Sequence, residues 1–183
     1  MRIVHCCAPL LALLIAGCST GTRISPTALP PSSYTSRDGG LQYQLPSGWF
    51  DATADSQATG HVVLLIRNDY GATIAVDKVH LDANAREQLH QGGLLEVAQV
   101  LMSLSSWDRG TVLMRTPRLL TLDDKEVCRY IMTVTATQDQ LQVTLLDTGR
   151  NVYAVNVLLS GKVAVRDGEL DALQDNFIGS LRW

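Results

Sequence analysis

The segment between residues 112 and 159 constrains the fold most, because strand-like runs follow one another there with very short joins. The runs are rich in Val, Leu, Ile and Thr. Strands joined so closely pair as antiparallel neighbours, since a parallel pair needs a crossover of roughly a dozen residues or more. The sequence therefore predicts an antiparallel meander. Its expected strands are Val112–Leu122, Glu126–Thr137, Leu141–Leu146 and Val152–Leu159, with joins at Asp123–Lys125, Gln138–Gln140 and Thr148–Arg150.

Further strands are expected before this segment. Leu41–Leu45 alternates strictly between apolar and polar residues, which predicts a half-buried strand. Val62–Ile66 is a continuous apolar run, typical of a central strand, and Ala72–His80 should pair with it across the turn Asn68–Gly71. Pro117 interrupts the first strand of the meander, so that strand is expected at a sheet edge or with a bulge.

The spacing of apolar residues predicts a helix over Asn84–Ser105. Gly92 and Gly93 interrupt this helix, and two glycines cost about 2 kcal/mol against alanine in a helix. We therefore expect a break or kink there, and a turn at Trp107–Gly110. The expected buried stripe consists of Leu94, Val97, Leu101 and Leu104, with Ala98 and Met102 beside it.

A second helix is expected at the end of the sequence. Asp167 is its expected N-cap, and Gly179 suits its exit. Asp175 lies off the apolar stripe, so its truncation should change stability by less than about 0.5 kcal/mol. The stripe consists of Leu170, Leu173, Phe177 and Leu181.

These elements predict an α+β fold, in which helices pack against an antiparallel sheet to cover their apolar stripes. The first strand runs into Pro46-Ser-Gly-Trp49, and the last helix runs into Ser180-Leu-Arg-Trp183. In these features and in its element order the chain resembles the PsbP-type extrinsic proteins of photosystem II and the DcrB-type bacterial envelope lipoproteins. The resemblance covers residues 41–183 and implies one domain, a PsbP-like α/β/α sandwich. It also implies binding or assembly of protein complexes, but no partner or metal-site residue matches.

The N-terminus is expected to be a signal peptide over residues 1–17. Cys6 to Ile15 has the length of a secretory apolar region and is too short to span a bilayer. The sequence Ile15-Ala16-Gly17-Cys18 resembles the lipobox of bacterial lipoprotein precursors. This implies cleavage between Gly17 and Cys18, a diacylglycerol on the Cys18 sulfur and an acyl group on its amine. Ser19 then indicates an outer-membrane lipoprotein facing the periplasm. The alternatives are an ordinary signal peptide cut at Ala16-Gly17, or an internal strand.

Residues 18–40 are expected to be the lipidated N-terminus and a flexible tether. Of the 22 residues from Ser19 to Gly40, 15 are Ser, Thr, Gly or Pro. The whole chain has a formal charge of −3, which argues against a general nucleic-acid binder. Hydrophobic residues make up 46%, enough to build a core in the remaining domain.

The search for chemical sites assigns no catalytic, cofactor-binding or metal-binding residue. His61, His80 and His90 lack the spacing of a helical metal site, although His80 and His90 could meet in space. Cys128 alternates with Tyr130 and Met132, which indicates a buried core thiol, the alternative being a reactive cysteine. The carboxylates of Asp123, Asp124 and Glu126 fit a solvated hairpin tip better than a Ca²⁺ loop.

The leading hypothesis is a non-catalytic, lipid-anchored envelope protein that binds another protein or supports a membrane complex. The alternative is a periplasmic carrier of a small hydrophobic ligand, held between sheet and helix near Met102, Met132 or Trp107. An uncharacterised hydrolase is a distant third. A deep apolar cavity would favour the carrier, and an exposed apolar patch on a filled domain would favour protein binding.

Overall fold

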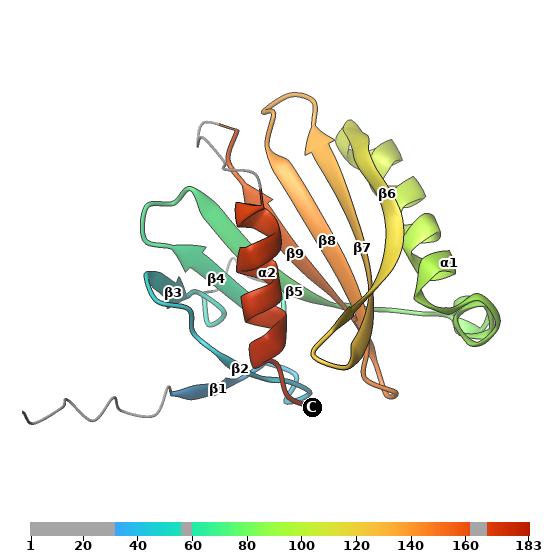
Figure 1. Cartoon of the computed structure of the whole chain (residues 1–183), viewed down its shortest axis with the longest axis horizontal. Coiled ribbons are helices and arrows are strands. Elements are labelled where there is room, and N and C mark those ends of the chain that lie inside the picture. Colours follow the sequence, from blue (N-terminus) through green and yellow to red (C-terminus); the bar gives the residue numbers. More distant parts are fainter. Residues whose placement is uncertain (1–31, 56–59, 162–167) are drawn as a thin grey trace, which may run out of the picture. The chain divides into compact units, whose positions relative to one another are not determined.

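A seven-stranded antiparallel sheet forms the centre of the folded unit (Figure 1). The computed structural model describes residues 32–55, 60–161 and 168–183, without the side chains of residues 104–109. The expectations for Gly17 and Cys18 and for the Leu104 and Trp107 side chains lie outside these residues, as does Asp167 itself. In spatial order the strands are β3 (Trp49–Asp51), β4 (Val63–Arg67), β5 (Ala72–Val79), β9 (Val152–Leu159), β8 (Gln140–Asp147), β7 (Lys125–Val134) and β6 (Thr111–Leu122).

The path of the chain confirms the expected hairpin and meander. After the hairpin of β4 and β5, the chain crosses one face of the sheet through α1 (Ala83–Arg109) and enters β6 at the far edge. It then returns strand by strand until β9 pairs with β5 along its full length. Strand β6 is an edge strand, and its register with β7 shifts between Leu113 and Arg115 and again between Arg115 and Arg118. The effect predicted for Pro117 is therefore confirmed.

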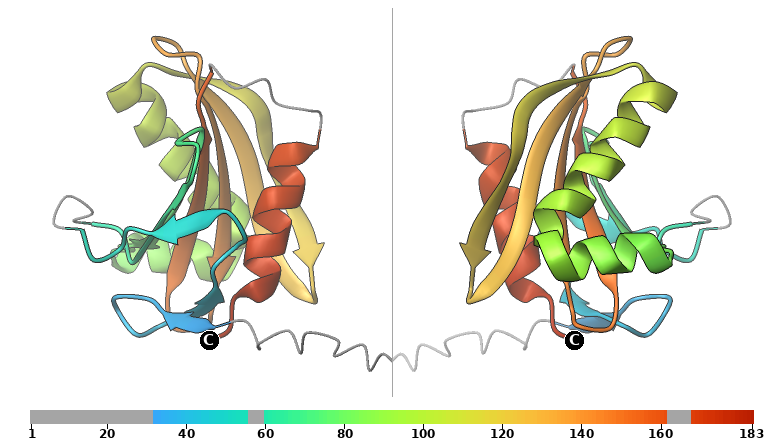
Figure 2. Two further views of the ribbon diagram at one scale, coloured as in Figure 1. Left: turned by 90° about the vertical axis from the view of Figure 1, so that its left-hand side faces the viewer. Right: turned by 90° about the vertical axis from the view of Figure 1, so that its right-hand side faces the viewer.

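The two helices lie on opposite faces of the sheet (Figure 2). Helix α1 contacts β6, β7 and β8 on one face. Helix α2 (Glu169–Ser180) lies on the other face, together with a hairpin of β1 (Ser33–Thr35) and β2 (Gln42–Gln44). The predicted α+β class, with helices packed against an antiparallel sheet, is confirmed.

The folded unit begins earlier than the sequence indicated. Contacts group Pro31–Trp183 into one unit, and β1 pairs with β2 antiparallel. The backbone N–H of Arg37 also donates to the carbonyl of Val62, at 2.9 Å. The expected end of the tether at Gly40 was therefore too late. Its polar composition hid this strand, because backbone hydrogen bonds hold the strand in place and no run of apolar residues marks it in the sequence.

Helix α1 breaks where the two glycines occur. Gly93 has a φ of 68° and a ψ of −163°, which are not helical values, so the predicted kink is confirmed. The Asp82 carboxylate caps the start by accepting from the N–H of Ala85, at 2.8 Å. The turn expected at Trp107–Gly110 was wrong, because the helix continues to Arg109. It ends at Gly110, a left-handed C-cap with a φ of 56°.

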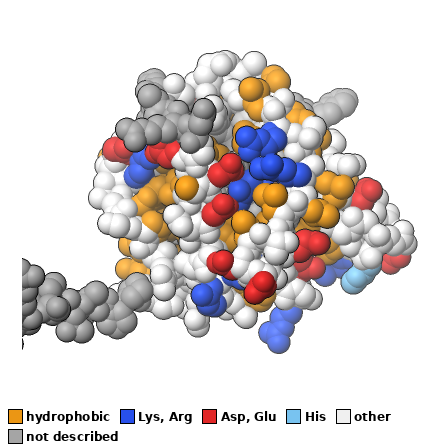
Figure 3. Space-filling model, in the orientation of Figure 1, with side chains coloured by type: hydrophobic (Ala, Val, Ile, Leu, Met, Phe, Trp, Pro, Cys, Tyr) orange, Lys and Arg blue, Asp and Glu red, His pale blue; other side chains and the backbone are white. Residues whose placement is uncertain are grey.

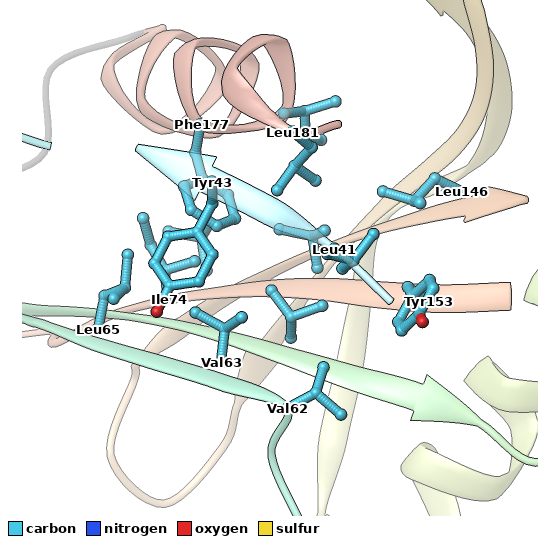
Figure 4. Packing of buried hydrophobic residues seen from close by; sticks show 14 of the residues in the cluster. Leu41, Tyr43, Val62, Val63, Leu65, Ile74, Leu146, Tyr153, Phe177 and Leu181 are labelled. Carbon is cyan, nitrogen blue, oxygen red and sulfur yellow. The ribbon is translucent and has the colours of Figure 1, made fainter. Parts of the chain in front are cut away.

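The core between the sheet and α2 confirms most of the buried apolar stripe that was predicted for the second helix (Figure 4). Leu170, Phe177 and Leu181 are buried, whereas Leu173 is only partly buried. The rings of Phe177 and Tyr43 lie 6.2 Å apart between their centroids. The hairpin of β1 and β2 is therefore part of this core.

Two predictions about the ends of α2 need correction. The residue before the helix is Gly168, with a φ of 82° and no side-chain cap, so the N-cap is not Asp167. Gly179 lies within the helix and does not end it. A Cβ at Gly179 would stand 2.8 Å from Oδ2 of Asp123, so this glycine permits close approach of the turn between β6 and β7.

The core between the sheet and α1 contains Cys128. This free thiol is fully buried, together with Tyr130 and Met132, which confirms the prediction. Burial raises the pKa of the Cys128 thiol to about 11, so the thiolate is scarce at neutral pH. Met102 packs against the same cluster as Met132. In the described residues, the space proposed for a hydrophobic ligand at these two methionines is therefore packed core.

Candidate functional site

A buried arginine anchors α2 to the sheet. Arg129 of β7 is only 2% exposed. Its guanidinium donates to Oγ1 of Thr144 at 2.9 Å, to Oδ1 of Asp171 at 3.2 Å and to Oδ1 of Asp175 at 2.5 Å. A buried cation of this kind is tolerated only with such partners. The expectation that Asp175 is inert was therefore wrong, since helical periodicity does not reveal a charge on the facing strand.

Two buried glutamines extend this network. Gln142 and Gln174 are both fully buried. Oε1 of Gln174 accepts from Nε2 of Gln142 at 2.8 Å and from Oγ1 of Thr144 at 2.6 Å, and Nε2 of Gln174 donates to the carbonyl of Val155 at 2.8 Å. Such directional contacts fix the position of α2 along the sheet. Asp171, on the same helix, reaches the edge strand through Arg115 of β6.

Strand β6 presents the most exposed apolar side chains of the sheet. Val112 is 51% exposed and Met114 66%, and Arg115 and Arg118 follow on the same strand. We call these four residues the β6 surface. Arg115 lies 3.5 Å from Oδ2 of Asp171, whereas Arg118 makes no salt bridge to any described residue. Figure 3 shows the neighbourhood, with Lys and Arg side chains between α2 and β6 and hydrophobic side chains beside them.

The outer side of β6 has no strand partner among the described residues. An unpaired edge exposes backbone donors and acceptors, and proteins limit uncontrolled pairing there with prolines, bulges and charges. Strand β6 has Pro117, two register shifts and two arginines near its middle. These devices disfavour open-ended strand addition. They leave the apolar side chains of Val112 and Met114 available to a complementary surface.

Two adjoining clefts lie at the end of the sheet near the turn between β8 and β9. The larger has a volume of about 690 Å³, and Asp38, Arg150 and Arg182 are among its lining residues. The smaller has a volume of about 150 Å³ and brings His80 and His90 together, as the sequence allowed. Among the described residues, no group of His, Cys, Asp or Glu is arranged to hold a metal ion. Both clefts have charged walls, unlike a hydrophobic carrier site.

The arrangement most similar to an acid–base pair involves His61. Its Nδ1 lies 2.5 Å from Oδ1 of Asp77, and Oδ2 of Asp77 accepts from Nδ2 of Asn156 at 2.8 Å. A carboxylate that orients an imidazole is one part of a nucleophilic site. No hydroxyl or thiol within the described residues bonds to His61. The pair therefore lacks an activated nucleophile in the described part of the chain.

The carboxylates of Asp123 and Asp124 belong to a tight hairpin tip, as predicted. Leu122 pairs with Lys125, so only two residues connect β6 and β7. Both aspartates have positive φ values, 47° and 63°, which such two-residue turns require.

Comparison with known proteins identifies the fold. No family model matches the sequence, and no curated protein sequence matches it. Cyanobacterial PsbP (CyanoP) from Synechocystis sp. PCC 6803 is similar in structure, with a TM-score of 0.60 and 12% identity over 86% of this chain and 95% of that one. The domain therefore has a PsbP-like fold.

Two further solved structures are similar. The Saccharomyces cerevisiae Ran-binding protein Mog1p has a TM-score of 0.51 and 8% identity, over 85% of this chain and 96% of that one. A protein from Bacteroides thetaiotaomicron has a TM-score of 0.51 and 11% identity, over 84% of this chain and 48% of that one. At such identities, structural similarity shows a shared fold and does not transfer a function.

Proposed function

We propose that this chain is a lipid-anchored protein of the bacterial cell envelope whose domain binds another protein and helps to assemble or hold a membrane complex, without catalysis. The observation that carries the proposal is the β6 surface, which exposes Val112 and Met114 on a domain with well-filled cores on both faces of its sheet. Exposed apolar side chains rimmed by charge are typical of protein-binding surfaces.

The anchor follows from the lipobox-like sequence that ends in Cys18. Neither described helix is both long and apolar enough to cross a membrane. Acyl chains on Cys18 would hold the protein stably, because two or more chains together anchor firmly where one does not. Confinement near a membrane raises the local concentration of the domain, so even a weak contact becomes effective. Ser19 favours the outer membrane, facing the periplasm.

The chemistry of the β6 surface suggests what the partner presents. Val112 and Met114 would be covered by an apolar contact, and the guanidinium of Arg118, which forms no salt bridge to a described residue, would pair with a carboxylate of the partner. The Mog1p neighbour is described as Ran-binding, so another protein of this fold binds a protein. That fact supports a binding role for the domain and does not carry Ran over as its partner.

Site-specific crosslinking in the native cells tests the proposal. We expect a photoreactive amino acid at Met114 to give a discrete crosslinked species, and Arg118→Glu in the same chain to abolish it. A matched control places the photoreactive residue at Tyr70, which is 76% exposed in the turn between β4 and β5. Absence of a discrete species at Met114, or the same species at Tyr70, would contradict the proposal.

A further inference from the structure

Helix α2 covers only part of the sheet face on which it lies. Rows of directly paired residues cross this face from β8 through β7 to β6, and paired residues lie on the same side of a sheet. In one such row, Gln142 of β8 is fully buried and Ile131 of β7 is half-buried, whereas 44% of the Arg115 side chain of β6 is exposed. The cover that α2 provides therefore ends between β8 and β6.

The rows on either side of this one show the same change. Thr133 of β7 is half-buried and pairs with the exposed Val112. Arg129 is buried because it bonds to α2, but its partner Arg118 is exposed. Figure 3 looks onto this side of the molecule. We call the α2-side face of β6 and β7 the open strip. It consists of Val112, Arg115, Arg118, Ile131 and Thr133, with the exposed Met114 beside it in the first register shift.

The charges at the open strip do not balance. Three guanidinium groups lie on this face, those of Arg115, Arg118 and Arg129. Two carboxylates of α2 face them. Asp171 is shared by Arg115 and Arg129, and Asp175 binds Arg129. One guanidinium, that of Arg118, is therefore in excess over the carboxylates that α2 contributes.

Two other nearby carboxylates do not correct this imbalance. Glu169, at the start of α2, forms a salt bridge with Arg67 at 3.7 Å. Glu126 of β7 lies two residues from Cys128, which is buried in the core on the α1 side, so alternation places Glu126 on that opposite side. A partner that covers the open strip would therefore be favoured by acidic side chains.

The edge of β6 favours docking through side chains over the addition of a strand. Pro117 lacks a backbone N–H, and register shifts occur on both sides of Arg115. An added strand needs a regular row of backbone donors and acceptors, which these features interrupt. A helix satisfies its own backbone hydrogen bonds and contacts a sheet through side chains alone.

The width of the open strip matches one helix. Neighbouring strands lie about 4.8 Å apart, so two strands with their margins span about 10 Å. An α-helix with its side chains is about 10–12 Å across, and packed helices lie about 8–10 Å apart between their axes. Gln174 of α2 bonds to Gln142 and Thr144 of β8, which places α2 above that strand. A second helix packed beside α2 would therefore lie above β7 and β6.

We infer that the protein partner of the β6 surface contributes an amphipathic α-helix, which lies on the open strip beside α2 and carries acidic side chains next to its apolar stripe. The inference rests on the proposed protein-binding function. The apolar stripe of this helix would cover Val112, Met114 and Ile131, and one of its carboxylates would pair with Arg118.

Photoreactive amino acids on the two sides of β6 test the inference in the native cells. One is placed at Val112, on the open strip. The control is placed at Leu119, which is 47% exposed and pairs with Cys128, so that it faces the α1 side. A helix on the open strip should give the same crosslinked species from Val112 as from Met114, and none from Leu119. A strand added at the edge would lie between the two sides and crosslink from all three positions, which would overturn the inference.

Mass spectrometry of the crosslinked peptides gives the conformation of the partner segment. Val112 and Met114 are two residues apart on β6, a distance of about 7 Å. Their crosslinks should fall about four residues apart on a helical partner, because a helix rises about 1.5 Å per residue. Crosslinks two residues apart would indicate a paired strand and would overturn the inference. A synthetic peptide of the crosslinked segment should also show helical circular dichroism when bound to the full chain.

A charge reversal tests the acidic side of the partner helix. Arg118→Glu should abolish the crosslink from Met114, and replacing the nearest Asp or Glu of the partner with Arg should restore it. Restoration would show that the variant is folded and that the two charges meet. A partner segment without Asp or Glu near its crosslinked residues would overturn this part of the inference.

The same experiment distinguishes failure of this inference from failure of the proposed function. Absence of a discrete species from Met114 would contradict protein binding at the β6 surface altogether. A discrete species that forms from both sides of β6, or that maps to a segment bound as a strand, would leave protein binding intact and overturn the helix. A species that joins two copies of this chain would also overturn it, by assigning the surface to self-association.

Discussion

Asp175 illustrates how much a single residue contributes through a partner on another element. Its carboxylate neutralises the buried guanidinium of Arg129, a role shared with Asp171. Because one carboxylate remains, we expect Asp175→Ala to lower the free energy of unfolding by about 1–3 kcal/mol, less than complete loss of a buried pair. Urea unfolding of Pro31–Trp183 would measure this. The neighbouring, exposed Asn176 provides the control, since Asn176→Ala should cost less than about 0.5 kcal/mol.

Cys128 is a second residue whose burial has a measurable consequence, because it makes the free energy of unfolding depend on pH. Burial raises its pKa to about 11 in the folded chain, from an ordinary value of 9.0. The unfolded chain therefore loses this proton first, and the free energy of unfolding should fall as pH rises from about 9 to about 11. The loss from this group should approach 3 kcal/mol. Cys128→Ala should show a correspondingly shallower decline in pH-dependent urea melts, and an identical decline would contradict the assignment.

Helix α2 is an element whose stability depends on docking. Phe177 is 1% exposed and packs against Tyr43 of β2. Truncating such a buried phenylalanine costs about 3–5 kcal/mol, a large part of the total stability of a domain. We therefore expect Phe177→Ala to lower the thermal midpoint clearly, with Asn176→Ala again as the matched control. Equal, small effects would mean that α2 is not docked on the sheet.

At the scale of the whole molecule, the proposed lipid anchor would decide where the domain acts. We expect Cys18→Ser to leave an uncleaved or soluble species and to abolish partitioning into the detergent phase, because the variant lacks the sulfur that we propose as the diacylglycerol acceptor. Phase partitioning of the native and variant proteins would check this. A variant that loses its leader and still stays firmly in the membrane would show that the attachment has another source.

Local patterns in the sequence determined the elements. Short joins between strand-like runs predicted the meander, glycines predicted the kink at Gly93, and proline predicted the irregular edge strand β6. Each of these features depends on conformational preferences within a few residues, so a single chain reveals it. The burial of Cys128 followed in the same way from period-two alternation.

Only the tertiary structure decided which distant residues meet. The pairing of β9 with β5, the contact of Asp175 with Arg129 and the joining of His80, His90 and Arg150 in one cleft all bring together segments far apart in sequence. Residues 33–40 were predicted to be linker because no apolar run marks them in the sequence. In the structure, backbone hydrogen bonds and the stack of Tyr34 on Tyr43 hold this segment in place. Periodicity records which face of an element is buried, but the partner that buries it is chosen by the packing of the whole chain.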